Sequence, residues 1–219
     1  AINFATAIGT AVSPDDFDAT SGTLVFAPGV AAMTVTVPTV NDNTHEGSED
    51  FTVALTSSDT FNASLNATVT ITPDGDVPPV VSISDAVAVS EGAGAVLEFT
   101  VSLSEASGLP VTVDYATADG SAAAPGDYAG STGTLVFAPG ETTKTISITV
   151  ADDAVYEAAP ESVSVNLTAV VGATLGAVTA SGSINDNDPM PTMAVSDVNL
   201  VEGDAGTTNA MLTVTLSGV

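Results

Sequence analysis

Carboxylate side chains gather where the alternating apolar pattern in the middle of the chain is interrupted. They are Glu91, Asp127, Asp152, Asp153, Glu157, Asp186 and Asp188. Pooled at one end of a domain, they would form a cage of hard oxygen ligands, which suits Ca²⁺ with its roughly six to eight oxygens. The set has no His or Cys, so transition metals fit less well. Any one of these aspartates taken alone is better explained as a solvated loop residue. For the whole set we predict a Ca²⁺ site, because uncompensated like charges in contact are costly.

The composition of the chain restricts its partners. The 219 residues include 27 acidic side chains against a single Lys or Arg, which gives a formal charge of −26. Nucleic acid and anionic membranes are bound through Lys and Arg, so we expect neither as a partner. No apolar run reaches the roughly 18 residues of a membrane span, and no direct membrane insertion is expected. The absence of Cys excludes disulfides and thiolate metal sites. A hydrophobic content of 44% favours a folded chain over acidic disorder.

A long internal repeat organises the chain. The octapeptide GTLVFAPG occurs at 22–29 and again at 133–140, 111 positions later. A third copy is begun, since Glu91-Gly92 recurs as Glu202-Gly203 and FTVSLS at 99–104 recurs as LTVTLS at 212–217. A repeat of this length is a whole domain. We predict a repeat lacking its first two strands at 1–77, a complete repeat at 78–189, and the first two strands of a further repeat at 190–219. Incomplete outer repeats favour a window from a longer protein.

The elements that must position the acids are predicted to be β-strands. Apolar side chains alternate with polar ones, as in Leu97, Phe99, Val101 and Leu103, which indicates strands with one buried face. About seven such segments are expected in the complete repeat, at 80–88, 97–103, 111–115, 134–137, 146–150, 163–167 and 177–184. This count is typical of an immunoglobulin-like sandwich. The predicted fold class is all-β, with tandem seven-stranded antiparallel β-sandwiches.

Four segments of the complete repeat resemble one known family. They are VSEGAG at 89–94, VDYATADGSAAAPGDY at 113–128, GTLVFAPGETTKTISITVADDAVYE at 133–157 and SINDND at 183–188. In order and spacing they are similar to the Calx-beta domain, which is known from the regulatory loop of sodium/calcium exchangers, an integrin cytoplasmic region and arrays in bacterial surface and secreted proteins. The resemblance covers nearly the whole chain and implies Ca²⁺ bound by loops at one end of each sandwich.

The resemblance also implies which residues are ligands. In the complete repeat they are the seven acids named above. In the first repeat the matching acids are Asp16, Asp42, Glu46, Asp74 and Asp76, while Asn41 stands where the complete repeat has Asp152. The exchanger pattern has a further acid soon after the position of Glu157 and three consecutive aspartates at the end. Here Ala158 and Ala159 come before Glu161, and Asn185 and Asn187 interrupt the aspartates. Fewer charges imply weaker sites, at the roughly 10⁻⁴–10⁻³ M typical of extracellular modules.

Two functional interpretations follow. The first is a non-enzymatic, calcium-stiffened spacer in a large extracellular or cell-surface bacterial protein with a role in adhesion or matrix, whose partners are neighbouring repeats or identical chains. The alternative is a filament subunit, in which the C-terminal strands of one chain complete the N-terminal repeat of the next by strand addition. An enzyme is not expected. His45 is the sole histidine, has no nearby nucleophile in the sequence, and is predicted to be a solvated loop residue.

Overall fold

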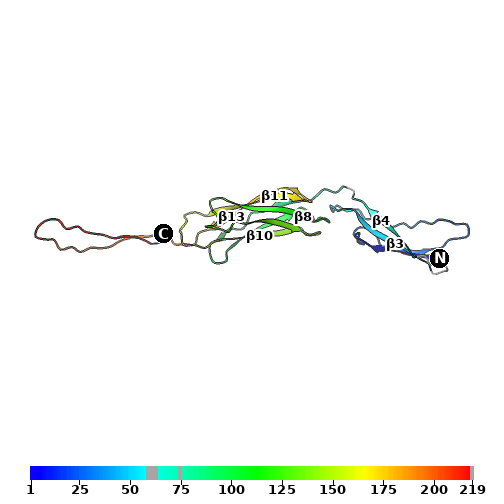
Figure 1. Cartoon of the computed structure of the whole chain (residues 1–219), viewed down its shortest axis with the longest axis horizontal. Coiled ribbons are helices and arrows are strands. Elements are labelled where there is room, and N and C mark those ends of the chain that lie inside the picture. The colour runs from blue at the N-terminus through cyan, green and yellow to red at the C-terminus, as the bar shows by residue number, and fades with distance from the viewer. Residues whose placement is uncertain (58–63, 74, 218–219) are drawn as a thin grey trace. The chain divides into compact units, whose positions relative to one another are not determined.

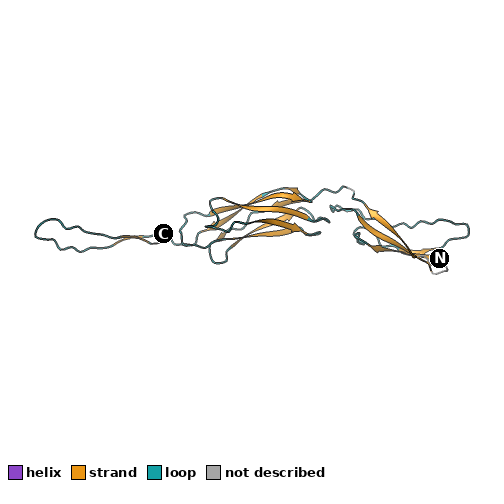
Figure 2. Cartoon of the chain, viewed as in Figure 1, coloured by secondary structure: helices purple, strands orange, loops and turns teal. Residues whose placement is uncertain are grey.

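The computed structural model describes residues 1–57, 64–73 and 75–217. These residues form strands and loops and no helix (Figure 2). The chain divides into two compact units, one of residues 1–79, 105–111 and 138–141 and the other of residues 80–104, 112–137 and 142–219. No described segment is a helix long and apolar enough to span a bilayer. The repeat boundaries after residues 77 and 189 stay predictions.

The complete repeat forms two facing sheets. One sheet has the order β10-β7-β5-β12 and the other the order β6-β13-β11-β8-β9; Figure 1 shows β10 in the layer opposite β8, β11 and β13. The strands of the first sheet are β5 (Val80–Ile83), β7 (Val96–Leu103), β10 (Thr143–Thr149) and β12 (Thr174–Leu175). Those of the second are β6 (Val89–Ser90), β8 (Val111–Asp119), β9 (Thr132–Phe137), β11 (Glu161–Val171) and β13 (Thr179–Asn185).

Apolar side chains from both sheets fill the space between them. Leu97, Phe99 and Val101 of β7 are fully buried, and so are Val163 and Val165 of β11. Their spacing of two residues places each set on one face of its strand. The prediction of an all-β sandwich is therefore confirmed.

The first strand of the complete repeat differs from the prediction. We expected one strand at 80–88, but the chain pairs with β7 only as far as Ile83 and then crosses to the other sheet. The backbone N–H of Ser84 still donates to Thr100 of β7, whereas that of Ala86 donates to Ser181 of β13. The segment β6 then pairs with β13 in parallel. One strand therefore serves both sheets, and the sandwich contains short parallel pairs as well as antiparallel ones.

The first repeat forms a single sheet with the order β2-β1-β3-β4. Its strands are β1 (Ile2–Ile8), β2 (Ser21–Leu24), β3 (Glu49–Ser57) and β4 (Ser64–Ile71). They correspond to β8, β9, β11 and β13, and the register is kept, since Phe4 faces Leu55 as Tyr115 faces Leu167. A small core of Ala11, Phe17, Phe51 and Val53 lies on this sheet, with the rings of Phe17 and Phe51 stacked at 4.2 Å between centroids.

A β-hairpin ends the described chain. It consists of β14 (Met193–Val195) and β15 (Val214–Leu216), which pair antiparallel with Met193 opposite Leu216. These strands correspond to β5 and β7 of the complete repeat. All of their side chains are exposed.

Candidate metal centre

Two loops of the same kind position the acids of each repeat. In the complete repeat the carboxylate of Asp127 accepts a hydrogen bond of 2.7 Å from the backbone N–H of Ala123. Asp16 of the first repeat accepts the corresponding bond from Val12. Such bonds from a residue to the backbone of its own turn orient the carboxylate before any ligand binds.

The second loop repeats in the same way. The carboxylate of Asp153 accepts a 2.7 Å bond from the N–H of Val155, and Asp42 accepts a 2.7 Å bond from Thr44. Both aspartates lie 111 positions apart, as the repeat requires. The two repeats of the sequence therefore form acidic loops with the same hydrogen bonds.

Most of the acids predicted in the complete repeat come together in two groups. The carboxylate oxygens within each group lie within 4.8 Å of one another, and the groups are Glu91, Asp186 and Asp188, and Asp127, Asp153 and Glu157. A hydrogen bond between the carboxyl groups of Glu91 and Glu157 links them. The loops after β6, β10 and β13 and the loop before β9 supply these residues, so all the contributing loops meet at one end of the sandwich.

The loop after β13 holds Glu91 in position. The backbone N–H of Glu91 donates to the carbonyl of Asn185, and the amide of Asn187 donates to the carbonyl of Glu91 at 2.7 Å. Asp186 accepts from the N–H of Glu157 at 3.2 Å and from the N–H of Asp188 at 2.9 Å. Asn187, which interrupts the aspartates in the sequence, thus anchors the opposite loop.

Several carboxylate oxygens at the acidic end of the sandwich are buried without a hydrogen-bond partner. Glu91 is 9% exposed, and its Oε2 accepts no hydrogen bond. The Oε2 of Glu161 and the Oδ2 of Asp188 are also buried and unpartnered. A carboxylate oxygen buried without a donor is costly, because it has lost water and gained nothing in exchange. A hard cation between these oxygens would satisfy them, so the residues present fit Ca²⁺.

The pKa values of these carboxyl groups also reflect their burial and their closeness to one another. Burial, a hydrogen bond with Glu157 and the charges of Asp153 and Asp186 raise the pKa of Glu91 to about 7. Burial and a hydrogen bond with Asp127 raise the pKa of Glu161 to about 7. These carboxyl groups therefore hold their protons more tightly than the same groups do in water.

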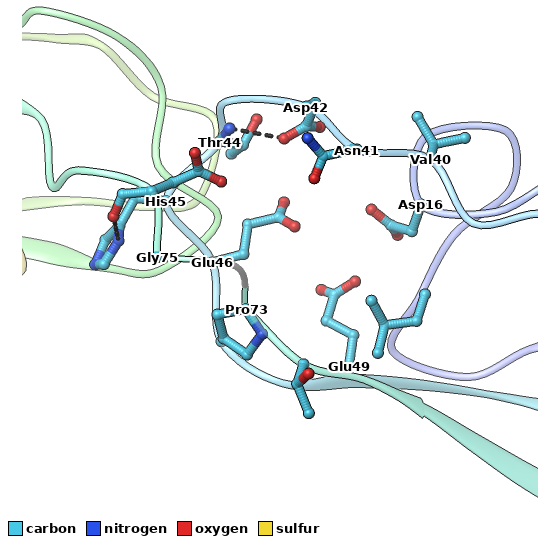
Figure 3. A pocket seen from close by; sticks show the side chains of 14 residues that line it. Asp16, Val40, Asn41, Asp42, Thr44, His45, Glu46, Glu49, Pro73 and Gly75 are labelled. Atoms are coloured by element: carbon cyan, nitrogen blue, oxygen red, sulfur yellow. Dashed lines mark hydrogen bonds between the residues drawn. The ribbon is translucent and has the colours of Figure 1, made fainter.

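A smaller version of the site lies in the first repeat. Asp16, Glu46 and Glu49 form a group whose oxygens lie within 4.8 Å of one another. They line a cavity of about 120 Å³, into which their carboxylates point (Figure 3). Burial and a hydrogen bond with Asp16 raise the pKa of Glu49 to about 7. Burial and the charges of Asp16, Asp42 and Asp76 raise the pKa of Glu46.

Some predicted ligands stay outside these groups. Asp152 is exposed and belongs to none of the three. Asp42 and Asp76 line the cavity of the first repeat, and their charges raise the pKa of Glu46. Asp74 lies outside the described residues. That any of these residues binds a metal stays a prediction.

Two acids that the sequence reasoning left out lie in the sites. They are Glu49 and Glu161, each the first residue of its strand, β3 and β11. Glu161 was noted only as displaced from the expected position by Ala158 and Ala159. The signal that could have found them is their recurrence, because they are separated by 112 positions once the one extra residue between the repeats is counted.

His45 is half-buried, and its Nδ1 lies 3.1 Å from the backbone carbonyl of Asp76. The sequence predicted a solvated loop residue, whereas the ring is held against the segment that follows β4. The contact of the ring is to a backbone carbonyl.

The sequence model of one protein family matches nearly the whole chain. It is described as "Calx-beta domain", and it matches residues 1–75 and again residues 74–188. The chain belongs to the Calx-beta family. The family's ion is Ca²⁺, as the sequence predicted. The two matches also confirm tandem domains of this type.

Curated relatives of this Calx-beta chain are ion exchangers. Sodium/calcium exchanger 1 of dog (Canis lupus familiaris) is 32% identical over 178 residues, which covers 71% of the chain and 18% of the exchanger. Sodium/calcium exchanger 2 of human is 58% identical over 45 residues, 20% of the chain and 5% of the exchanger. The chain thus spans less than a fifth of the length of these relatives.

Solved structures of the same kind are also similar. The apo-form CBD1 domain of Calx is 27% identical, with a TM-score of 0.43, and the match covers 50% of this chain and 98% of that one. The CBD12 pair of CALX1.2 is 24% identical, with a TM-score of 0.43, and covers 84% of this chain and 86% of that one.

Proposed function

We propose that this chain is a non-enzymatic calcium-binding structural repeat of a larger extracellular or cell-surface protein, in which Ca²⁺ stiffens the joints between repeats. The observation that carries the proposal is the set of buried, unpartnered oxygens on Glu91, Glu161 and Asp188. They face a cluster of further carboxylates and have no donor. In the complete repeat the residues that would hold the ion are Glu91, Asp127, Asp153, Glu157, Glu161, Asp186 and Asp188.

The position of the ligands supports a mechanical role. Asp186 and Asp188 lie directly after β13, where the complete repeat gives way to the next segment. An ion that ties them to Glu91 and Glu157 would restrict the chain at the point where it leaves the sandwich. Neighbouring repeats would then be the partners of the chain. Binding energy from the ion would also stabilise the sandwich, because the unfolded chain does not present these ligands together.

The amino-acid composition supports a location outside the cell. One Lys or Arg among 219 residues, together with the formal charge of −26, suits a repeat that works in millimolar Ca²⁺ outside the cell. A role in bacterial adhesion or matrix is part of the proposal. Asn187 stands between the two aspartates after β13, and Asp152 is exposed outside the acidic groups. Fewer charged ligands support weak sites, at roughly 10⁻⁴–10⁻³ M.

Thermal unfolding in excess chelator and in 10 mM Ca²⁺, with Mg²⁺ as the control, tests the proposal. Ten millimolar Ca²⁺ is about 10 to 100 times the expected Kd, which adds about 1.4–2.7 kcal/mol to the folded state. For a domain of this size that raises the midpoint by about 5–20 °C. If the unfolding curves in chelator and in Ca²⁺ coincide, the proposal of calcium stiffening is wrong. The chain would then be a β-sandwich spacer that does not depend on Ca²⁺.

A second candidate function is self-assembly of identical chains into a filament. It is favoured by the exposed apolar side chains of the C-terminal hairpin, where Met193 is 75% and Val214 is 62% exposed. Strand addition between chains would cover them.

A further inference from the structure

The first and last segments of the complete repeat run side by side in the same direction. We call residues 80–91 the entry segment and residues 174–187 the exit segment. Within them β5 pairs with β12 and β6 pairs with β13, and both pairs are parallel. The pairing begins with Val80 opposite Thr174. The chain therefore enters the sandwich where this pairing starts and leaves the sandwich where the pairing ends.

Hydrogen bonds continue the pairing where the entry segment crosses from one sheet to the other. The backbone N–H of Ile83 donates to the carbonyl of Ala177, and that of Ala86 donates to the carbonyl of Ser181. The N–H of Ser181 donates in turn to the carboxylate of Asp85 at 2.7 Å. The two segments are therefore joined between the short ladders as well as within them.

The end of the entry segment is held twice by the exit segment. The backbone N–H of Glu91 donates to the carbonyl of Asn185 at 2.9 Å. The side-chain amide of Asn187 donates to the carbonyl of Glu91 at 2.7 Å. Asn187 thus fastens the entry segment next to the point where the chain leaves the sandwich.

This arrangement determines how the repeat meets a pulling force. Tension along the chain reaches the repeat before Val80 and leaves it after Asp188. Because the two segments are parallel, the opposed forces pull them past each other along their length. Hydrogen bonds between parallel strands are evenly spaced, so they share such a load and must break together. Strands that are peeled apart from one end lose their bonds one at a time.

The acidic group lies at the loaded end of this pairing. Carboxylate oxygens of Glu91, Asp186 and Asp188 lie within 4.8 Å of one another. Glu91 is 9% exposed, and its Oε2 has no hydrogen-bond partner. A cation held by these oxygens would join the end of the entry segment to the residues that leave the sandwich, in addition to the hydrogen bonds.

We propose that the entry and exit segments form a load-bearing clamp, which carries tension through the complete repeat while the sandwich stays folded, and that Ca²⁺ between Glu91, Asp186 and Asp188 locks it. The part of Ca²⁺ in the clamp rests on the proposed calcium function. The part of the hydrogen bonds does not.

The clamp shields the rest of the sandwich from the load. Residues 92–173 lie between the two segments in the sequence, and the load passes from one segment to the other without crossing them. This part of the repeat stays folded while the clamp holds. When the clamp opens, residues 80–188 become free to extend to at most about 390 Å.

Pulling single molecules of the full chain in two directions tests the clamp. The chain has no Cys, so introduced cysteines fix the points of attachment. Val77→Cys with Met190→Cys loads the two segments along their length, and both positions are exposed. Ala93→Cys with Met190→Cys peels the segments apart, because both attachments then lie at the exit end.

Unfolding under force is governed by the unfolding rate. At one constant force in chelator, the Val77 pair should unfold at least about tenfold more slowly than the Ala93 pair, because two hydrogen bonds broken in one step are already worth that factor. An equal or faster rate for the Val77 pair overturns the clamp.

Calcium should slow unfolding of the Val77 pair under the same force. At 10 mM Ca²⁺, about 10 to 100 times the expected Kd, the rate should fall about 10- to 100-fold relative to chelator, because the ion must leave before the clamp opens. Mg²⁺ is the control ion. Glu91→Gln should lose most of this effect, and an undiminished effect in that variant contradicts the lock.

Two matched variants test the hydrogen bonds in chelator. Asn187→Ala removes the amide bond to Glu91, and Thr134→Val removes a side-chain bond from β9 to Asp114 of β8, outside the clamp. Only Asn187→Ala should speed unfolding of the Val77 pair, by about 2- to 12-fold. Equal unfolding rates of the two variants under load would show that the clamp does not carry the force.

Thermal unfolding with and without Ca²⁺ distinguishes failure of this inference from failure of the proposed function. If Ca²⁺ raises the melting temperature but leaves the rate under load unchanged, Ca²⁺ does not lock the clamp and the calcium function stands. If Ca²⁺ changes neither and the Val77 pair still resists the load, the calcium function fails and the hydrogen-bonded clamp stands.

Discussion

Replacing Glu91 by Gln should act with opposite sign in chelator and in Ca²⁺. The side chain is 9% exposed, has an unpartnered oxygen, and lies among other carboxyl groups that raise its pKa to about 7. At pH 8 in chelator the wild-type carboxylate is ionised and repelled by its neighbours. The neutral amide removes that repulsion, so the variant should melt at a higher temperature than the wild type.

In Ca²⁺ the same substitution removes a charged ligand. Ligand charge tunes Ca²⁺ affinity over decades, and a tenfold loss is a modest expectation. At a Ca²⁺ concentration 100 times the wild-type Kd, the stabilisation falls from about 2.7 to about 1.4 kcal/mol. The calcium-induced rise in melting temperature should therefore shrink by about 5–10 °C.

Tyrosine fluorescence is the suitable assay. The chain has three Tyr and no Trp, and the tyrosines, Tyr115, Tyr128 and Tyr156, all belong to the complete repeat. The signal therefore reports on the unfolding of that repeat alone. Glu98→Gln is the matched control, because Glu98 is exposed on β7 and should change neither curve. The reasoning is refuted if Glu91→Gln lowers the midpoint in chelator and keeps the full calcium shift.

Three further predictions follow from the same structure. In chelator, the melting temperature should fall as pH rises from about 4.5 to about 7, because the folded state binds the Glu91 proton more tightly than the unfolded state does; saturating Ca²⁺ should abolish this fall in a pH series. In dilute solution, denaturant unfolding should show a loss of about 3–5 kcal/mol for Phe137→Ala and a clearly smaller loss for Phe26→Ala, because the second ring is already 40% exposed. Tyr128→Phe should cost about 1.5–3 kcal/mol by the same measurement, since the hydroxyl donates to the Asp119 carboxylate; an unchanged midpoint would show that water replaces this bond.

The strands of the complete repeat could be predicted because their apolar residues alternate with a period of two and each strand has a partner. The same alternation at Val35 and Val37 gives no strand, since alternation describes which face is buried and cannot supply the neighbour that pairs the backbone. The split between β5 and β6 was missed for a related reason. A strand that changes sheets keeps its alternation, and only its hydrogen-bond partners reveal the crossing.

The acidic loops were predictable where an acid interrupts a strand pattern, as at Asp127 and Asp153. Glu49 and Glu161 were missed because each begins a strand, where a charged side chain reads as an exposed end residue. Asp152, in contrast, was predicted to be a ligand but lies outside the acidic groups. It lies next to Asp153 in the sequence, but only one of two adjacent side chains can point into the cluster, and the turn to Val155 selects Asp153.

The hydrogen bond between the carboxyl groups of Glu91 and Glu157 requires a proton, and so does the one between Glu161 and Asp127. Near neutral pH the metal-free chain therefore holds protons at the acidic end of the complete repeat, and an arriving Ca²⁺ would displace them. Binding is an exchange of one cation for others. The heat measured in calorimetry should then vary with the ionisation enthalpy of the buffer, and in a weakly buffered space around a cell each ion taken up would acidify its surroundings.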